Sequence, residues 1–285
     1  MAMTTISNSR QKRSVEQGAG KHGSQVVLAI RAVLNETQKS LWQLWGHRSI
    51  VLTEFITMAA VYPLLQLIIG NGTIERALVP PTLLAFLTYP ILFVATNKLV
   101  GDLLEEIHSG TFEQMHLSPF SPAWLLVGRL TALVLEGLLI SVVVAVGMTA
   151  ALGVSIPLQA GGLLPGVLTL IDILGFALLI GGLALRLHQI GSILHVFSGL
   201  IFALNGTLIP VGLYPGWVQI VARFLPTTLG IEALRQVVLE GQSLGALWTD
   251  GTLPWLVAHA AGLSVIGWVV FLTSDRRAMR RGIAR

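Results

Sequence analysis

The stretch WLLVGRLTALVLEGLLISVVVAVGMTAAL, residues 124–152, decides the fold class of this chain. A helix crosses the ~30 Å hydrocarbon core of a bilayer at ~1.5 Å per residue, so about 20 mostly apolar residues are needed. The stretch exceeds that length, so it can tilt in a bilayer or project beyond it. Its apolar run is continuous and does not alternate with polar residues, which favours a helix over a barrel strand.

Five further apolar stretches lie on either side of it, at 50–70, 78–100, 163–185, 190–213 and 252–273. The composition agrees, because 53% of the 285 residues are hydrophobic and only 11% are charged, against roughly 25% charged in soluble domains. With a mean hydropathy of +0.76, these values exclude a soluble enzyme, a disordered chain and a coiled coil. The short RLHQ turn at 186–189 predicts a helical hairpin. We therefore expect an all-α integral membrane protein with six transmembrane helices.

Basic residues indicate the orientation, because cytoplasmic loops of membrane proteins carry an excess of Lys and Arg. With the N-terminus inside, 15 of the 18 Lys and Arg residues are cytoplasmic, and only Arg76, Arg223 and Arg235 fall outside. Six crossings then place both termini in the cytoplasm, and we expect the bacterial cytoplasmic (inner) membrane. The net charge of +4 thus indicates topology, and no nucleic-acid partner is expected.

The chain divides into four parts. Residues 1–24 are polar and basic without an apolar core, which predicts a disordered cytoplasmic tail and no secretory signal. Residues 25–48 repeat apolar side chains at helical spacing, which indicates an amphipathic interfacial helix with Trp42 and Trp45 at head-group level; a plain solvated linker is the alternative. Residues 49–275 form the six-helix domain, and 276–285 are a basic cytoplasmic tail.

The most polar internal stretch, KLVGDLLEEIHSGTFEQMHLSPFSPAWL (98–125), follows the second apolar stretch on the cytoplasmic side. Gly110 interrupts a first helix, Thr111 caps a second one, and Pro119 ends it. Acids beside exposed apolar anchors are typical of a helix that docks into a partner's groove, whereas the alternative is an ordinary solvated loop. The candidate docking residues are Glu105, Glu106, Thr111, Phe112, Glu113, Met115, Ser118 and Pro119.

A second non-spanning segment, residues 205–249, lies outside. It is too apolar for a free loop and too interrupted by Pro210, Pro215 and Pro226 to span. Residues 216–225 and 227–239 read as two short amphipathic helices, re-entrant or lying at the outer interface.

Catalytic chemistry is not expected in this chain. It has no Cys, and GAGKHG at 18–23 lacks the upstream Gly of a P-loop and carries His22 where Ser or Thr must bind Mg²⁺. His188 and His195 share a helix face without a nearby carboxylate, which is a weak metal signal, so we expect no metal site and no catalytic residues.

Ionisable residues inside apolar stretches are costly and become functional candidates by default. Glu54, Glu136 and Asp172 are such residues. Arg129 and Glu136 are seven apart on one helix face, so a structural ion pair or a snorkelling charge at the helix end is the plain interpretation of both. Asp172 and the Asn205–Pro210 break are the candidates for lining a translocation pathway, namely Asp172, Asn205, Gly206 and Pro210. The paired glycines Gly161-Gly162 and Gly181-Gly182 permit close helix packing.

Two segments resemble the membrane permease subunit of ABC exporters, in the type-2 family of drug-resistance and polysaccharide exporters. The string EIHSGTFEQMHLSPFSPAWLLVGR (106–129) looks like the family's first cytoplasmic loop. GTLIPVGLYPGWVQIVARFLPTTLGIEALRQ (206–236) looks like its C-terminal signature, with Pro226 and Arg235 at matching places. Leu229 departs from that signature, because the family often has His, Ser or Tyr there.

The resemblance implies six helices per subunit, a coupling helix in the first cytoplasmic loop, and two permease subunits, as homo- or heterodimer, paired with two ATP-binding subunits. ATP and Mg²⁺ would then reside on the partner, and this chain would carry no cofactor and would contact membrane lipid. A lipophilic or lipid-linked cargo suits the apolar spans. Two other functions stay open: a non-transporting membrane anchor or regulator, and an ion-coupled secondary carrier.

Overall fold

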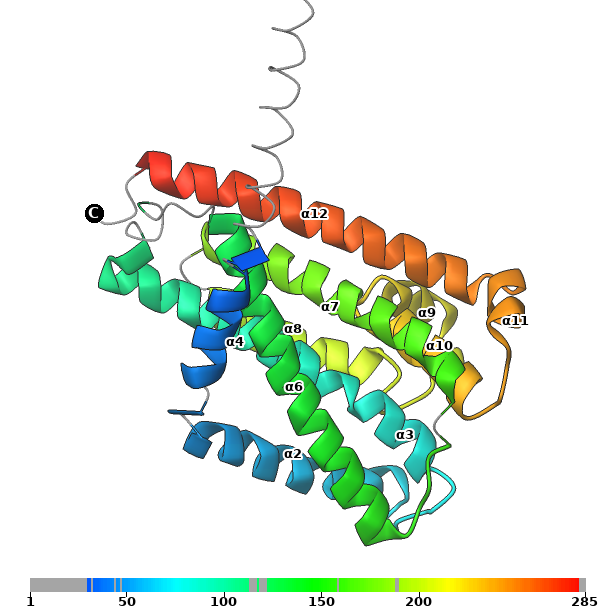
Figure 1. Cartoon of the computed structure of the whole chain (residues 1–285). Helices are drawn as coiled ribbons and strands as arrows, with labels where there is room; N and C mark the ends of the chain where they lie inside the picture. Colours follow the sequence, from blue (N-terminus) through cyan, green and yellow to red (C-terminus); the bar gives the residue numbers. More distant parts are fainter. Residues whose placement is uncertain are drawn as a thin grey trace, which may run out of the picture.

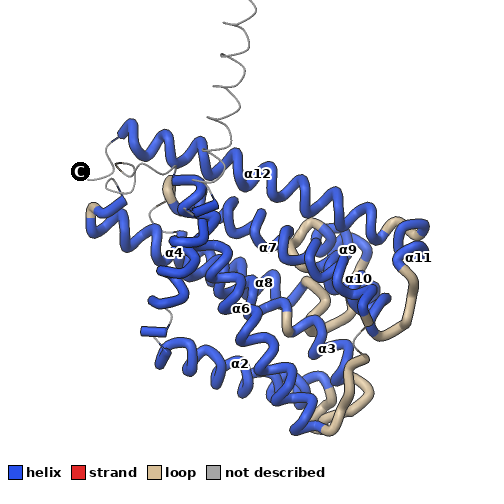
Figure 2. The backbone as a smooth tube through the Cα atoms, viewed as in Figure 1, coloured by secondary structure: helices blue, strands red, loops and turns tan. Residues whose placement is uncertain are grey.

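The computed structural model describes residues 30–31, 33–43, 45–46, 48–112, 117, 122–157, 159–187 and 190–281. Within these ranges the secondary structure is helical and contains no strand (Figures 1 and 2). The predicted tail 1–24, and Glu113, Met115, Ser118 and Pro119 of the predicted docking loop, lie outside the described residues.

Five helical segments in the described part of the chain are long and apolar enough to cross a membrane. They are α2 (Arg48–Ile69), α3 with α4 (Val79–Phe86 and Thr88–Ser109), α6 (Pro122–Leu152), α7 (Leu163–Ala184, preceded by η1, Ala160–Gly162) and α12 (Thr252–Arg281). Each coincides with a stretch chosen from the sequence. The prediction of an all-α integral membrane protein is confirmed.

The span expected at 190–213 is divided. Its helix, α8, covers Ile190–Leu204, and 15 residues reach only about 22 Å, short of the ~30 Å hydrocarbon core. Asn205 and Gly206 follow, and Gly206 takes φ 91°, a left-handed conformation that ends the helix. The chain resumes as a short 3₁₀ turn, η2 (Val211–Leu213). The expected single helix is therefore a short helix followed by an irregular segment.

Three short helices gather where α12 begins (Figure 1). α9 (Gly216–Arg223) and α10 (Thr228–Val238) are the two amphipathic helices expected between residues 216 and 239. α11 (Leu244–Thr249) was not foreseen from the sequence. Proline sets the start of α9, because Pro215 precedes it and its fixed φ suits a helix entry.

α7 lies at the centre of the bundle and packs along α12, with α4 and α10 also against it. Glycines bring the α7 and α12 backbones together: a Cβ on Gly175 would lie 2.6 Å from Ser264 N, and one on Gly182 would lie 2.8 Å from Phe271 Cα. Gly181 faces Leu99 of α4, and a Cβ there would lie 3.0 Å from its Cδ2. Close packing at Gly181-Gly182 is thus confirmed.

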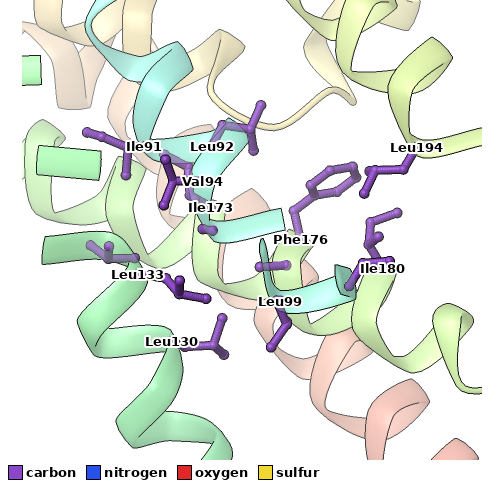
Figure 3. Packing of buried hydrophobic residues seen from close by; sticks show 14 of the residues in the cluster. Ile91, Leu92, Val94, Leu99, Leu130, Leu133, Ile173, Phe176, Ile180 and Leu194 are labelled. Atoms are coloured by element: carbon purple, nitrogen blue, oxygen red, sulfur yellow. The ribbon is translucent and has the colours of Figure 1, made fainter. Parts of the chain in front are cut away.

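The main core fills the space between α4, α6, α7 and α8 with aliphatic and aromatic side chains (Figure 3). Leu99, Ile173 and Leu194 are among the buried members, from three different helices. At the break between α3 and α4, α6 supplies a hydrogen bond to the backbone: Ser141 Oγ donates to Leu87 O at 2.7 Å. The core therefore fixes the relative positions of the helices that carry the polar clusters described next.

The N-terminal helix packs on the start of α6. Residues 30–31, 33–43 and 45–46 are helical, Thr37 Oγ1 donates to Gly128 O at 2.9 Å, and a Cβ on Gly128 would lie 2.7 Å from Val33 O. The apolar side chains Ile30, Leu34, Leu41, Trp42 and Trp45 stay 40–70% exposed. This is the amphipathic pattern expected of an interfacial helix.

Candidate functional site

Two ion-paired groups join the helices around the predicted docking loop. In the first, Arg129 Nη2 of α6 lies 2.5 Å from Glu106 Oε1 of α4 and 3.8 Å from Glu36 Oε1 of the N-terminal helix. One guanidinium therefore ties three helices together at the place where α4 ends.

The second group centres on Lys98 of α4. Its Nζ lies 2.5 Å from Glu136 Oε1 of α6 and 3.0 Å from Glu54 Oε2 of α2. The predicted pairing of Arg129 with Glu136 is wrong: both residues form ion pairs, but with partners on neighbouring helices. Helical spacing could not show this, because Lys98 and Glu136 are 38 positions apart.

Acidic groups outnumber basic ones in this ion-pair cluster, which we define as Glu36, Glu54, Lys98, Glu106, Arg129 and Glu136. Within the cluster four carboxylates face two cations, and Glu36 is also paired with Lys39 at 3.1 Å. Oε2 of Glu106 and Oε2 of Glu136 are buried without a hydrogen-bond partner among the described residues. Breaking a buried pair leaves an uncompensated charge, which costs several kcal/mol. The cluster thus holds α2, α4 and α6 in one arrangement.

A cavity of about 620 Å³ opens beside the ion-pair cluster. It is lined by Lys39, Ser40, Gln43, Ile50, Lys98, Asp102, Glu105, Glu106, Ser109, Thr111, Arg129, Ala132 and Leu133. Three of the predicted docking residues, Glu105, Glu106 and Thr111, therefore line one polar hollow, and Glu105 and Thr111 are exposed.

Phe112 departs from its predicted exposure. Gly110 ends α4 in a left-handed conformation (φ 73°), and the chain then turns so that Phe112 is only 2% exposed and joins the main core. Leu117 is 85% exposed. Of the apolar residues expected to dock on a partner, Phe112 thus packs in the chain's own core and Leu117 faces outward.

The sequence-predicted residues of the second region meet at the α9–α10 linker. Asp172 of α7 accepts a hydrogen bond from Thr227 N to Oδ2 at 2.9 Å, and its Oδ1 lies 2.7 Å from His259 Nδ1 of α12. Asn205 Nδ2 donates to Thr227 Oγ1 at 3.0 Å. Asp172, Asn205 and Thr227 are fully buried. We call Asp172, Asn205, Thr227 and His259 the Asp172 cluster.

The backbone of Thr227 has a strained conformation, which the hydrogen bonds of the Asp172 cluster stabilise. It follows buried Pro226 and takes φ 72°, a left-handed conformation that a β-branched residue rarely adopts. Two hydrogen bonds hold it there, one to Asp172 of α7 and one from Asn205, which follows α8. His259 of α12 holds the same linker at Phe224, whose carbonyl oxygen lies 3.2 Å from His259 Nε2. In this single chain Asp172 and Asn205 therefore fasten the irregular segment, and their role in a pathway stays a prediction.

Arg235 fastens the same region from α10. Its Nε and Nη2 donate to Pro81 O at 3.0 and 2.9 Å, and Nη2 also donates to Gly206 O at 2.7 Å. Burial lowers the pKa of this guanidinium, and the nearby Glu232 carboxylate opposes that shift. Arg235 and Gly206 are thus joined directly, whereas Pro210 is exposed.

Sequence reasoning missed Thr227, His259 and Lys98. No spacing rule connects His259 to Asp172, because the two are 87 positions apart, and Lys98 resembled an ordinary basic residue at a helix end. The sequence did contain one signal for the Asp172–His259 pair. An acid deep in an apolar stretch requires a partner, and the last apolar stretch offers His259 as one.

The sequence model of the family described as "ABC-2 type transporter" matches residues 32–239, from the N-terminal helix to the end of α10. The chain is 28% identical over 187 residues to "Probable multidrug ABC transporter permease YbhR" of Escherichia coli K12, and equally so to the protein of that name in E. coli O157:H7. Each alignment covers 64% of this chain and 49% of the relative. The chain thus spans about half the length of the curated relatives it matches.

Proposed function

Because the chain belongs to the ABC-2 type transporter family, we propose that it is the membrane-spanning permease subunit of an ATP-driven exporter. The observation that supports this most is the extent of the family match, which runs through both segments that sequence analysis singled out: the loop after α4 and the segment from Gly206 to Arg235. The five long apolar helices supply the membrane domain that such a role requires.

The energy source belongs to a separate subunit in this proposal. The printed sequence contains no Walker A motif, so ATP and Mg²⁺ would bind a partner. The polar cavity lined by Glu105, Glu106 and Thr111 is the proposed docking place for that ATP-binding subunit. Its lining couples directly to the membrane helices, because Glu106 pairs with Arg129 of α6.

Transport requires a second copy or a related permease subunit. α7 is packed on α4, α10 and α12, and the centre of this single chain is filled by its core. A path for a drug-sized solute would therefore form between two subunits, with Asp172, Asn205, Gly206 and Pro210 as candidates near its outer end. We expect a lipophilic or lipid-linked cargo, in keeping with the multidrug name of the E. coli relatives.

Reconstitution tests the proposal. The chain is purified alone and together with an ABC-type ATP-binding subunit, sought first in the reading frames beside its gene, then placed in proteoliposomes and assayed for ATP hydrolysis and movement of a lipophilic fluorescent dye. We expect both activities only with the partner, and both lost when the Walker A lysine of the partner is changed to Ala. Dye movement by the chain alone would favour a carrier or channel; stable association without any transport would favour an anchor.

A further inference from the structure

A groove of about 670 Å³ lies on the surface between α9, α10 and the first half of α12. It is lined by Ile220, Arg223, Phe224, Leu229, Glu232, Asp250, Gly251, Thr252, Trp255, Ala258, His259, Gly262, Leu263 and Ile266. The groove is separate from the polar cavity beside the ion-pair cluster, and His259 is the one member of the Asp172 cluster that lines it.

The lining changes character along α12. Thr252, Trp255, His259, Gly262 and Ile266 recur every three or four residues, so they form one face of the helix. From 252 to 266 that face runs about 21 Å. The charged lining residues are Arg223 at the end of α9, Glu232 of α10 and Asp250 before α12, and Arg223 is next to Phe224, whose carbonyl lies 3.2 Å from His259 Nε2. Beyond His259 the α12 lining residues Gly262, Leu263 and Ile266 carry no charge. Charges along the first part of the groove and an apolar lining beyond it match an amphiphile that lies along the helix.

The charged lining residues specify the head group. Arg223 contributes one positive charge and Glu232 and Asp250 two negative ones. Among the described residues no ion pair within 4.0 Å involves Arg223 or Glu232, although the Glu232 carboxylate acts on the Arg235 guanidinium, and Asp250 Oδ1 accepts a hydrogen bond from Thr252 N at 2.8 Å. His259 is already engaged, because its two ring nitrogens meet Asp172 and the Phe224 carbonyl. A head group with one phosphate and one ammonium would satisfy both signs, since phosphate pairs with Arg and ammonium with carboxylates.

We propose that this groove binds a phospholipid with an ethanolamine head group, its phosphate at Arg223 and its ammonium at Glu232 and Asp250. One acyl chain lies along Phe224, Trp255, Leu263 and Ile266, where Gly262 leaves room for it. A second copy of the chain is a poorer occupant, because an apolar helix in the groove would bury the Arg223 guanidinium without a carboxylate partner. The assignment of this lipid to the outer leaflet rests on the proposed orientation of the chain. The proposal that the groove binds the lipid does not depend on that orientation.

Gly262 offers a variant that blocks the groove without disturbing the fold. No atom lies within 4 Å of a Cβ built there, so Gly262→Leu projects a side chain into the space assigned to the acyl chain. Gly147→Leu is the matched control, because Gly147 is an exposed glycine of the membrane helix α6 whose Cβ also meets no atom within 4 Å.

The test uses the purified full-length chain in nanodiscs that contain photoactivatable phosphatidylethanolamine or phosphatidylglycerol, with labelled peptides identified by mass spectrometry. We expect phosphatidylethanolamine to label residues 255–266 about tenfold more than phosphatidylglycerol, the ratio that one charge-assisted hydrogen bond gives. Gly262→Leu should abolish this labelling and Gly147→Leu should retain it. Glu232→Gln combined with Asp250→Asn should remove the preference for the ethanolamine lipid.

Three results would overturn the proposal: equal labelling by the two lipids in the unmodified protein, equal labelling of the two glycine variants, or photocrosslinks from Trp255 to a second copy in place of lipid. The readout is lipid labelling and requires neither ATP hydrolysis nor transport. Its failure is therefore distinguishable from failure of the proposed function.

Discussion

At the scale of single residues, the Asp172 cluster shows how one buried charge is accommodated in an apolar bundle. His259 Nδ1 lies 2.7 Å from Asp172 Oδ1, and its Nε2 lies 3.2 Å from Phe224 O. Both neighbours are acceptors, so an imidazolium ring satisfies both contacts whereas a neutral ring satisfies only one. The carboxylate and the ring are thus mutually dependent, and together they hold Thr227 in its left-handed conformation.

That dependence predicts strong non-additivity. Asp172→Asn and His259→Gln should each lower the thermal unfolding temperature of the purified protein, since each leaves a buried polar group poorly paired at a cost of about 1–3 kcal/mol. The double variant should lose less than the sum, with a coupling of about 0.5–3 kcal/mol. Asp172→Asn combined with Glu75→Gln, an exposed loop residue, serves as the additive control. Additivity in both pairs would contradict the cluster.

The sequence identified Asp172 but not its surroundings. An acid inside an apolar stretch is recognisable from the sequence alone, because a charge among apolar residues is costly unless the fold supplies a partner. Its partner depends on which face of α12 meets α7, and close contact at Gly175 and Gly182 decides that. Phe112 illustrates the same limit: the periodicity marked an apolar face correctly, but no pattern tells whether such a face meets a partner or the chain's own core.

At the scale of elements, helix ends were predictable wherever a backbone cause stood in the sequence. Gly110 ends α4 because glycine readily adopts the left-handed conformation found there. Pro215 precedes α9 because its ring fixes φ at a value that suits a helix entry. α8 ends at Leu204, earlier than its apolar run suggests, because the chain turns at Asn205 and Gly206 to meet Thr227 and Arg235. That reason lies in tertiary contacts, so hydropathy alone placed the boundary too far along the chain.

The contact between α7 and α12 predicts which glycines the fold requires. Gly182→Ala should destabilise the protein by about 1–3 kcal/mol, the usual cost of overpacking, because its Cβ would lie 2.8 Å from the Phe271 backbone. Gly166→Ala in the same helix is the control, since no atom lies within 4 Å of its Cβ, and it should be neutral or stabilising. Thermal unfolding in detergent measures both, and equal effects would contradict glycine-mediated packing.

The loop after α4 yields a second prediction at this scale. If it docks an ATP-binding subunit, Leu117→Asp and Glu105→Lys should weaken co-purification with that subunit while thermal stability stays unchanged, because both side chains are exposed. The apolar change should have the larger effect, since an exposed charge pair is worth only about 0–1 kcal/mol. Phe112→Asp should instead lower stability, because that side chain is buried. Full association of the Leu117→Asp variant would contradict docking at this loop.

At the scale of the whole molecule, the lengths of the helices and the positions of the charges point to the same orientation. α12 has 30 residues, or about 45 Å, whereas the hydrocarbon core takes about 30 Å. If α12 enters the bilayer near its first turn, its last ten residues project from the other side. Those residues include Arg276, Arg277, Arg280 and Arg281, so the projecting end is strongly basic.

This asymmetry predicts that both termini and the loop after α4 lie in the cytoplasm, because basic segments are retained on that side. The ion-pair cluster then lies toward the cytoplasmic side of the helix bundle. Reporter fusions at Ser109 and Arg281 should give the inside signal, and fusions at Gly72 and Gly241 the outside signal. Gly241 is the most informative site, since it lies between α10 and α11, in the segment that joins α8 to α12. An inside signal there would require α8 and the segment after it not to cross, which would leave the chain with five spans and place α9–α11 on the cytoplasmic face. Replacing Arg276, Arg277, Arg280 and Arg281 by Gln should weaken the bias without reversing it, because the N-terminal basic residues remain.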